Sequence, residues 1–285
     1  MNKRIYVLGA GVMGSGVAQL FAQNAYQVTL IDISEQQLEV AQEKIARLLR
    51  YQSIIHKTNP ATNKTTQEIL SNISYTTEYD SLSQASIIIE NITEKWSYKE
   101  KLYNELNQLC PSNCIIGANT SAISITKIAS LMVNPERIVG VHFMNPVPLI
   151  PMVEMIRGHH TSETTIEQMK NLLASVGRKS IVVNDSVGFV TNRAMMIFVN
   201  EAIFMLQENV ATAEDIDTLF RQCFGHKMGP LQTADLIGLD TILYSLDVLY
   251  EDLNDPKYRP CWLLKKMVAA GLHGEKSKQG FYAYQ

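Results

Sequence analysis

The stretch Lys3-Arg4-Ile5-Tyr6-Val7-Leu8-Gly9-Ala10-Gly11-Val12-Met13-Gly14 decides the fold of this chain. It is a short apolar run followed by G-x-G-x-x-G, and residues 15–24 after it have the composition of a helix. Between a buried strand and a helix, this pattern forms a tight turn whose backbone amides and helix dipole bind a pyrophosphate. The sequence therefore predicts a dinucleotide-binding turn, with the phosphates held at Gly9, Gly11, Val12, Met13 and Gly14.

An acidic residue stands where such a turn needs one. A second apolar strand, residues 28–31, ends in Asp32, which follows Gly14 by 18 residues. The dinucleotide fingerprint has an acidic residue roughly 20 residues on, where it accepts hydrogen bonds from the adenosine ribose. Its charge would repel a 2′-phosphate, so we predict NAD rather than NADP as the cofactor. The alternative is a glycine-rich turn that binds nothing.

Length, charge and hydropathy narrow the class of protein. At 285 residues the chain is long enough for two domains. A net charge of −3, a pI near 6.1 and the lack of a basic stripe argue against a nucleic-acid-binding protein. No apolar run is as long as a membrane span, and three glycines break the run that follows Lys3 and Arg4, unlike a signal peptide. We expect a cytoplasmic protein.

The cysteines carry no recognisable site. Cys110, Cys114, Cys223 and Cys261 have spacings that match no zinc-binding pattern. Disulfides are rare in cytoplasmic enzymes. We therefore expect ordinary thiols and no metal.

Apolar runs alternate with helical stretches over about the first 155 residues, which predicts a doubly wound α/β sheet with mainly parallel strands. The predicted strands are residues 5–8, 28–31, 73–77, 86–89, 114–118 and 138–143. A helical stretch from 34 to about 55 breaks at 58–63 and resumes at about 65–70. This stretch predicts a helical hairpin arm that contacts either the substrate or a partner.

The chain changes character near residue 185. A strand at 152–156, a helix at 162–176 and a strand at 180–183 lead to Asn184-Asp185-Ser186, which reads as a domain boundary with a helix cap. From there the pattern is helical, beginning with an apolar helix at 187–207. We predict a nucleotide-binding domain at 1–184 and an all-helical domain at 185–285, whose first helix also packs against another subunit.

His142 is the main catalytic candidate. It lies near the carboxyl end of the predicted strand 138–143, the edge of the sheet where ligands bind. Glu154 lies within the apolar strand 152–156, and a carboxylate buried there needs a partner. A His–Glu pair suits alcohol oxidation, because the imidazole takes the hydroxyl proton while hydride goes to the nicotinamide. A satisfied core histidine is the alternative. The other five histidines lie in predicted loops or turns.

Several polar residues lie near the same edge. Asn119-Thr120-Ser121 follows the strand 114–118, and Asn145 comes shortly after His142. Taken alone, these residues and Asn192 suit turns or helix caps as well as a site.

Taken together, these residues resemble the L-3-hydroxyacyl-CoA dehydrogenase family, particularly its short bacterial 3-hydroxybutyryl-CoA members. The resemblance covers essentially the whole chain. The matching segments are residues 9–14, 119–121, 142–148, Glu154, 185–193, 228–230, 234–240 and 280–282. It implies a Rossmann-like domain followed by a helical dimerisation domain, and therefore a homodimer.

The resemblance also implies roles for individual residues. His142 would be the catalytic base and Glu154 its partner, while Ser121 and Asn192 would hold the substrate near His142. Asn145 would lie near the nicotinamide ribose of NAD, and Asn119 and Ser121 would also bind the cofactor. The remaining cofactor-binding positions would be Glu94, Lys99 and Lys276.

The arm departs from the family pattern, and this leaves open whether CoA or an acyl carrier protein carries the acyl group of the substrate. Residues 50–57 carry few cations, whereas family members have a lysine-rich arm that meets the phosphates of CoA. Pro151 and Ala122 replace a usual lysine and serine. One reading is a short 3-hydroxyacyl-CoA such as 3-hydroxybutyryl-CoA. Another is the same chemistry on an acyl group carried by an acyl carrier protein, as in polyketide extender-unit biosynthesis of the hydroxymalonyl or aminomalonyl type. The non-enzymatic alternative is an NAD-binding structural or sensor protein.

Overall fold

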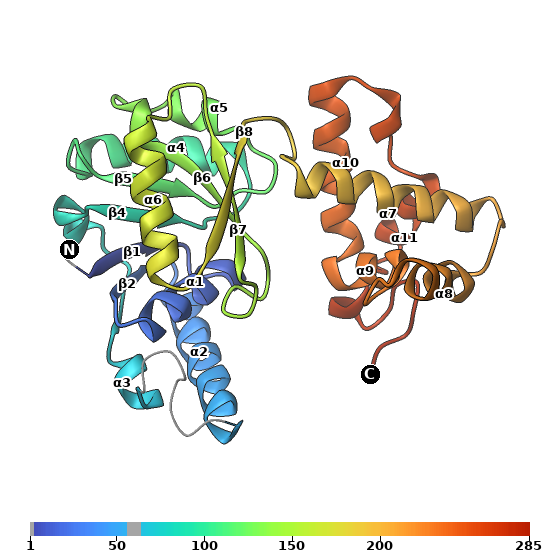
Figure 1. Ribbon diagram of the computed structural model, residues 1–285, viewed down its shortest axis with the longest axis horizontal. Helices are drawn as coiled ribbons and strands as arrows, with labels where there is room; N and C mark the ends of the chain where they lie inside the picture. The colour runs from blue at the N-terminus through green and yellow to red at the C-terminus, as the bar shows by residue number, and fades with distance from the viewer. Residues whose placement is uncertain (1–2, 56–63) are drawn as a thin grey trace. The chain divides into compact units, whose positions relative to one another are not determined.

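The computed structural model of the chain describes residues 3–55 and 64–285, which divide into two compact units, Met1–Asp185 and Ser186–Gln285 (Figure 1). The first unit is a sheet covered by helices on both faces, and the second is built from helices.

Within the described residues, the first unit forms one eight-stranded sheet in the order β3-β2-β1-β4-β5-β6-β7-β8. Its strands are β1 (Arg4–Leu8), β2 (Gln27–Ile31), β3 (Ile73–Thr76), β4 (Ile87–Glu90), β5 (Ile115–Ala118), β6 (Ile138–Phe143), β7 (Met152–Arg157) and β8 (Lys179–Asn184). The run from β3 to β6 is parallel with its reversal between β1 and β4, so the predicted doubly wound α/β fold is confirmed.

The sheet is mixed at one edge. β7 runs antiparallel to β6, whereas β7 and β8 are parallel. The connection from Phe143 to Met152 contains no helix, and a parallel pairing needs a longer crossover. This antiparallel pairing places residues of β6 directly opposite residues of β7.

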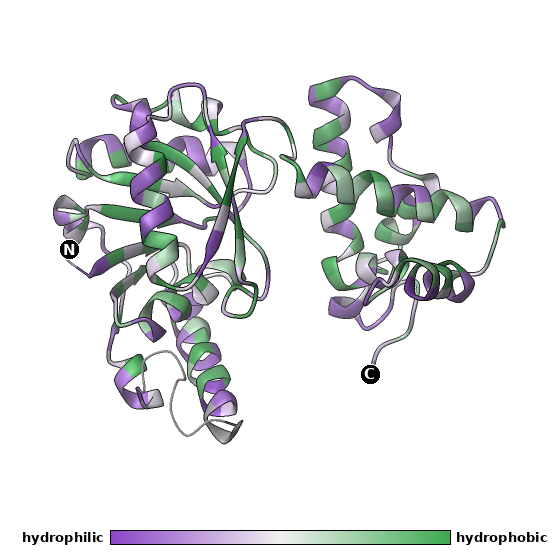
Figure 2. Ribbon diagram, viewed as in Figure 1, coloured by the Kyte–Doolittle hydropathy of each residue, from purple (hydrophilic) through white to green (hydrophobic). Residues whose placement is uncertain are grey.

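Helices of the first unit cover both faces of the sheet. They are α1 (Val12–Gln23), α2 (Glu35–Ile55), α3 (Thr66–Leu70), α4 (Trp96–Leu109), α5 (Ile125–Ala129) and α6 (Glu163–Ser175). Buried residues of α1, α2 and α6 form one core with Val139 and Val141 of β6. Gly140, between them, faces the opposite side, where Ile125 of α5 packs. The strands are correspondingly hydrophobic, and polar residues lie on the outer helices (Figure 2).

The predicted arm is present as α2 and α3, which contact each other. The predicted break at 58–63 lies outside the described residues, and so do the side chains of residues 53–55. The described part of α2 packs Leu38, Ala41 and Ile45 into the core of the first unit.

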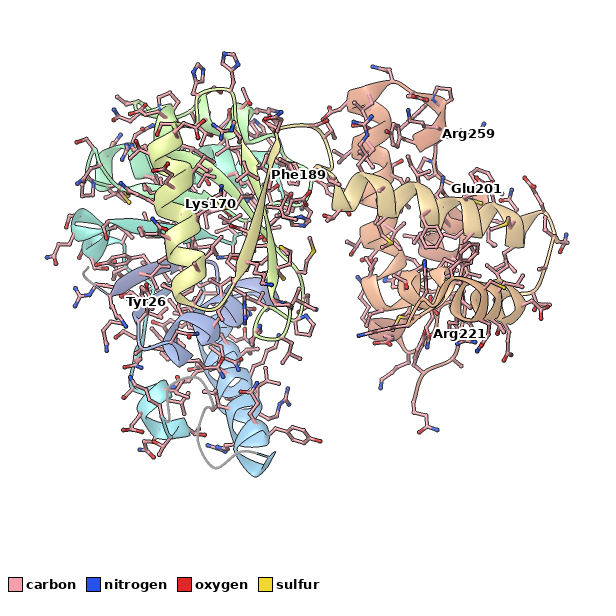
Figure 3. All side chains as sticks on the ribbon, viewed as in Figure 1. Tyr26, Lys170, Phe189, Glu201, Arg221 and Arg259 are labelled. Atoms are coloured by element: carbon pink, nitrogen blue, oxygen red, sulfur yellow. The ribbon has the colours of Figure 1, made fainter. Side chains whose placement is uncertain are left out.

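The second unit contains α7 (Thr191–Gln207), α8 (Ala213–Phe224), α9 (Pro230–Ile237), α10 (Leu239–Leu253) and α11 (Trp262–Ala269). The first helix begins at Thr191, so the predicted start at 187 is wrong. Gly188 and Phe189 have positive φ angles of 72° and 53°, which turn the chain before the helix can begin; Figure 3 labels Phe189 in this turn. Among the described residues, no helix is both long and apolar enough to cross a membrane.

Two buried carboxylates fasten the end of the chain to these helices. Asp217 of α8 accepts hydrogen bonds from the Leu231 and Gln232 amides of α9 and from the Tyr282 hydroxyl. Asp235 of α9 accepts hydrogen bonds from the Phe281 and Tyr282 amides and from the Tyr284 hydroxyl. Gly229 lies against Asp217 and Gly280 against Asp235, so the segments 228–230, 234–240 and 280–282 meet around these two carboxylates.

Candidate active site

The glycine turn between β1 and α1 has the backbone that a dinucleotide site needs. Gly9 has a φ of 89°, and a Cβ on Gly14 would lie 1.8 Å from the Gly9 carbonyl oxygen. A side chain at either position would break the turn. At Gly11, by contrast, an added Cβ would meet nothing within 4 Å. The backbone at Gly11 is therefore open to a close approach.

The N-terminus of α1 fits an anion. Gly11 caps the helix without a side-chain hydrogen bond, and the first turn holds no acidic residue. The first amides of any helix, here including those of Val12 and Met13, have no partner within the helix and lie at the positive end of its dipole. These groups fit a pyrophosphate.

Asp32 is already part of this turn. Its Oδ2 accepts a hydrogen bond from the Ala10 amide at 2.7 Å, and its Oδ1 accepts one from the Ser34 amide at 3.0 Å. Each carboxylate oxygen has more than one lone pair, so a ribose hydroxyl can still donate to Asp32. The two amides fix the carboxylate at the end of β2, beside the glycines.

The structure brings together His142, Glu154 and Ser121. The antiparallel register pairs His142 with Glu154, and His142 Nδ1 lies 3.0 Å from Glu154 Oε2. Both side chains are largely buried, at 9% and 6% exposure. On the other side of the ring, His142 Nε2 lies 3.1 Å from Ser121 Oγ. The imidazole is thus held between a carboxylate and an exposed serine hydroxyl.

A second set of polar contacts connects the strand ends around this triad. Asn119 donates to Asn91 Oδ1 at 2.7 Å and accepts from the Phe143 amide at 3.2 Å. These bonds fix the carboxyl ends of β4, β5 and β6 relative to one another. Asn119 therefore contributes to the framework of the site through its own side chain.

Glu94 contacts the turn that carries Ser121, and Lys99 in turn contacts Glu94. Glu94 accepts hydrogen bonds from the amides of Ser121 and Ala122. The Lys99 side chain has no exposed surface, and its Nζ pairs with both oxygens of Glu90 at 2.8 and 2.7 Å. The sequence reasoning missed Glu90 as a partner, although it is an acidic residue ending an apolar strand, the same signal that identified Glu154.

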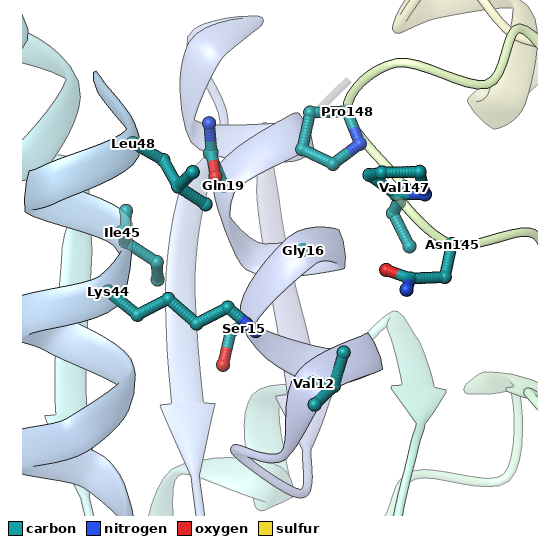
Figure 4. Close-up of a pocket in the computed structure, with 11 residues that line it drawn as sticks. Val12, Ser15, Gly16, Gln19, Lys44, Ile45, Leu48, Asn145, Val147 and Pro148 are labelled. Atoms are coloured by element: carbon teal, nitrogen blue, oxygen red, sulfur yellow. The ribbon is translucent and has the colours of Figure 1, made fainter. Parts of the chain in front are cut away.

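A pocket of about 280 Å³ lies between α1, α2 and the turn 145–148 (Figure 4). Its lining includes Asn145 together with Gln19, Lys44 and Leu48. The Gln19 side chain is buried, and neither its amide nitrogen nor its oxygen has a hydrogen-bond partner among the described residues. Burial and the nearby positive charge of Arg47 lower the pKa of Lys44. Sequence reasoning did not single out Gln19 or Lys44, because nothing local distinguishes them from ordinary helical residues.

Two expected site residues lie in the second unit. Asn192 is the second residue of α7. Lys276 is paired with Asp240, with 2.5 Å between Nζ and Oδ1. This pair lies next to Gly238, where the φ of 101° separates α9 from α10. The ion pair joins the segment 234–240 to Lys276.

We expected the boundary residues 184–186 to cap the first helix of the second domain, but Asp185 does not do so. Its Oδ2 accepts hydrogen bonds from Ser124 Oγ at 2.7 Å and from the Thr126 amide at 2.8 Å. It therefore caps α5 of the first unit, not the following helix. The residue that precedes α7 is Val190, which makes no side-chain cap.

Across residues 3–55 and 64–285, no group of three or more His, Cys, Asp or Glu side chains could hold a metal ion. The four cysteines, which all lie in that part of the chain, are free thiols.

Comparison with known proteins gives full-length matches. A family model described as "3-hydroxyacyl-CoA dehydrogenase, NAD binding domain" matches residues 4–186, and the corresponding C-terminal domain matches residues 188–284. A probable 3-hydroxybutyryl-CoA dehydrogenase of Bacillus subtilis is 40% identical over 283 residues, covering 99% of this chain and 98% of the relative. The 3-hydroxybutyryl-CoA dehydrogenase of Bradyrhizobium diazoefficiens is 41% identical, covering 99% and 96%.

A solved structure agrees with these matches. The crystal structure of (S)-3-hydroxybutyryl-CoA dehydrogenase from Ralstonia eutropha superposes with a TM-score of 0.93 at 38% identity and covers all of both chains.

Proposed function

Because the chain belongs to the 3-hydroxyacyl-CoA dehydrogenase family, we propose that it interconverts short L-3-hydroxyacyl-CoA thioesters and their 3-oxoacyl forms, with 3-hydroxybutyryl-CoA and acetoacetyl-CoA as the preferred pair. The protein is an NAD-dependent oxidoreductase. The Ser121–His142–Glu154 triad is the observation that carries the proposal, since it places a general base between a positioning carboxylate and a hydroxyl group. The relatives are named dehydrogenases, which does not favour a structural or sensor protein.

The cofactor would be held by the turn between β1 and α1. The pyrophosphate would lie against Gly11 and the amides of Val12 and Met13, and Asp32 would accept hydrogen bonds from the adenosine ribose. The open space at Gly11 supports this assignment. NAD, when bound, supplies the hydride acceptor.

The triad would transfer the proton between the substrate and His142. Glu154 accepts a hydrogen bond from Nδ1–H of His142, which selects the tautomer with a lone pair on Nε2. Nε2 then takes the proton of the substrate hydroxyl during oxidation, and Glu154 stabilises the imidazolium that forms. In the reverse direction His142 returns the proton to the carbonyl oxygen. Ser121 Oγ, beside Nε2, would donate a hydrogen bond to the same substrate oxygen.

The pocket beside Asn145 suits the CoA part of the substrate. Gln19 lines this pocket with a buried side chain whose amide has no hydrogen-bond partner among the described residues. Lys44 adds a positive charge at the same pocket, which suits the CoA phosphates. The relatives' names favour CoA over an acyl carrier protein. Turnover of a substrate carried by an acyl carrier protein is therefore one outcome of the experiment described below.

We also propose a homodimer formed through the second unit. α7 leaves Ile197, Phe198 and Phe204 only partly buried, and Leu219 and Phe224 of α8 are 56% and 70% exposed. Exposed apolar residues gathered on neighbouring elements are typical of an interface. The mass of the purified protein in solution, for wild type and Phe224→Glu, tests this. A monomeric wild type would rule out the homodimer. A cytoplasmic location stays a prediction.

The decisive experiment compares two substrates with the same acyl group. Purified protein and NADH are mixed with acetoacetyl-CoA or with an acetoacetyl group on an acyl carrier protein, and NADH consumption is followed. We expect efficient turnover with the CoA thioester. Turnover with the carrier-linked substrate alone would overturn the proposal for the handle while leaving the reaction type intact. NADH binding without turnover of either substrate would contradict the reaction itself.

A further inference from the structure

The connection between β6 and β7, residues 144–151, forms one wall of the pocket beside α1 and α2 (Figure 4). Pro146, Pro148 and Pro151 all lie in it, and proline has no amide hydrogen to donate. A connection with so few amides cannot pair all of its carbonyl groups internally. Its conformation therefore depends on donors and packing that other segments supply.

The Val147 side chain fastens this connection to α1. Val147 is 2% exposed and belongs to the core of the first unit, whereas Leu149 nearby is 66% exposed. On α1, Val147 meets Gly16, where an added Cβ would lie only 3.0 Å from the Val147 Cβ. Glycine inside a helix is less stable than alanine, and the close approach of the connection accounts for its presence at this position.

The Arg178 side chain binds the same connection from the residue that precedes β8. Its Nη2 donates a hydrogen bond to the Pro148 carbonyl at 2.8 Å and lies 3.5 Å from the Val147 carbonyl oxygen. The next residue adds a bond from the Lys179 amide to the Pro151 carbonyl at 2.9 Å. The beginning of β8 thus supplies donors that the connection itself lacks.

The guanidinium of Arg178 bonds to backbone carbonyls. Among the described residues, its acceptors are the carbonyls of Val147, Pro148 and the preceding Gly177, and its Nε is buried without a partner. Hydrogen bonds from a charged donor are roughly twice as strong as those between neutral groups. The bond to Pro148 is the shortest of the three, so the connection is the main partner of this half-buried side chain.

Asn145 lies near the start of the connection that is held in this way. It lines the pocket together with Val147 and Pro148 (Figure 4). A movement of the connection away from α1 would widen the pocket and carry Asn145 with it. His142 and Glu154, by contrast, are fixed by the pairing of β6 with β7. The connection therefore affects how the substrate is bound rather than how its proton is transferred.

We propose that Arg178 is a positioning residue: it holds the connection 144–151 against α1 and so fixes the pocket wall that contacts the CoA part of the substrate. Gly16 allows the close approach, and Arg178 maintains it. The part of this inference that concerns the substrate rests on the proposed function, whereas the part that concerns the connection does not.

The kinetic test compares Arg178→Met with Arg178→Lys. Methionine removes every donor, whereas lysine keeps the charge and can still bond to one carbonyl. We expect Arg178→Met to raise KM for acetoacetyl-CoA about 3- to 10-fold, because substrate binds only to the closed connection and the closed population falls. Since the triad is untouched, kcat should stay within about 2-fold of wild type. Arg178→Lys should raise KM less. The matched control is Lys179→Met, an exposed neighbour whose backbone bond to Pro151 is preserved.

Hydrogen exchange followed by mass spectrometry tests the connection without any substrate. The amides of Leu149 and Ile150 donate to the Pro146 carbonyl at 2.9 and 3.1 Å, so their exchange reports whether the connection keeps its folded shape. Arg178→Met should make the segment 144–151 exchange about 10-fold faster, since losing a hydrogen bond from a charged group changes an equilibrium by about that factor. Other segments of the first unit should exchange as in wild type, and so should the whole of Lys179→Met.

A further variant approaches the connection from α1. Gly16→Ala places a methyl group 3.0 Å from the Val147 Cβ, so the connection must shift outward. It should raise KM for acetoacetyl-CoA and leave kcat unchanged, as Arg178→Met does. If Arg178→Met does not fold, Arg178→Lys and Gly16→Ala still decide the matter.

The outcomes separate this inference from the proposed function. If wild type reduced no acyl thioester but Arg178→Met still exchanged faster in 144–151, the proposed function would fail and the positioning role would stand. Faster exchange with an unchanged KM would overturn the link between the connection and the substrate. Faster exchange throughout the first unit, unchanged exchange in 144–151, or a fall in kcat at constant KM would overturn the positioning role.

Discussion

His142 and Glu154 lie directly opposite each other on the antiparallel strands β6 and β7, with 3.0 Å between Nδ1 and Oε2. The relationship is set by strand register, so neither side chain needs a loop to reach its partner. In an antiparallel sheet, opposite residues have their Cβ atoms about 4.5–5.5 Å apart. A one-residue slip would move the carboxylate to the other face of the sheet. The orientation of the imidazole is therefore as stable as the sheet itself.

Substitutions of His142 and of Glu154 should lower kcat to different extents. His142→Gln should lower kcat for acetoacetyl-CoA reduction by about 10²- to 10⁴-fold, the usual contribution of a general acid or base. Glu154→Gln should lower kcat less, because the imidazole keeps its place but loses the carboxylate that stabilises its charged form. NADH binding should persist in both variants. His159→Gln, an exposed histidine of the same unit, is the control, and an equal loss there would argue against a specific role for His142.

Asp32 should set the choice between the two nicotinamide cofactors. Asp32→Ser removes the negative charge that repels a 2′-phosphate, so the ratio of kcat/KM for NADH to that for NADPH should fall. Some NADH activity will also be lost, because the Ala10 amide loses its 2.7 Å acceptor. Steady-state kinetics with both cofactors measure the ratio. A wild type that prefers NADPH would show that the assignment of Asp32 is wrong.

Residues of the pocket should lower KM by binding the CoA part of the substrate. Gln19→Leu and Lys44→Met should raise KM for acetoacetyl-CoA by about 10-fold, which corresponds to roughly 1.4 kcal/mol of lost binding. With a truncated acetoacetyl thioester that lacks the nucleotide, Lys44→Met should behave like wild type. Glu43→Gln, an exposed neighbour on α2, is the control. Equal KM changes for the full and truncated substrates would exclude a contact between Lys44 and the phosphates.

Asp235 should make the stability of the second unit depend on pH. Burial raises the pKa of its carboxyl group above the value in the unfolded chain. The native state therefore keeps this proton over a range where the unfolded state has lost it, and stability declines as pH rises through the folded pKa. Asp235→Asn removes this dependence. The stability difference between wild type and Asp235→Asn should be largest near pH 4 and smaller near about pH 7.

Urea denaturation monitored by circular dichroism measures this difference. At both pH values Asp235→Asn should be less stable, since an amide cannot accept all three hydrogen bonds from Phe281, Tyr282 and Tyr284. Leaving such donors unpaired costs about 1–3 kcal/mol. A difference that grows with rising pH would contradict the assigned direction of the pKa shift.

Local pattern predicted much of the first unit. Short apolar runs between helical stretches identified the strands, and the glycines with Asp32 identified the turn between β1 and α1. Glu154 was recognisable because an isolated carboxylate in an apolar strand needs a partner. The same reasoning, applied to Glu90, would have pointed to a buried cation such as Lys99.

Other features depend on contacts between distant segments. Asp185 looks like a helix cap at the domain boundary, yet it caps α5, about 60 residues earlier in the chain. The start of α7 was placed too early because hydropathy does not reveal the left-handed turn at Gly188 and Phe189. Gln19 and Lys44 lie on two different helices, and only the packing of α1 against α2 makes them neighbours.

The sequence by itself determined the sheet, its nucleotide-binding turn and the two catalytic candidates, because these follow from short-range periodicity and from the cost of burying a charge. The tertiary structure decided which groups meet. The reversal of β7 set His142 against Glu154, and the fold brought Lys99 of α4 and Glu94, which precedes α4, close to the Ser121 turn. Hydrogen bonds and ion pairs depend on distances of a few tenths of an ångström between residues far apart in the chain, and no local pattern encodes such distances.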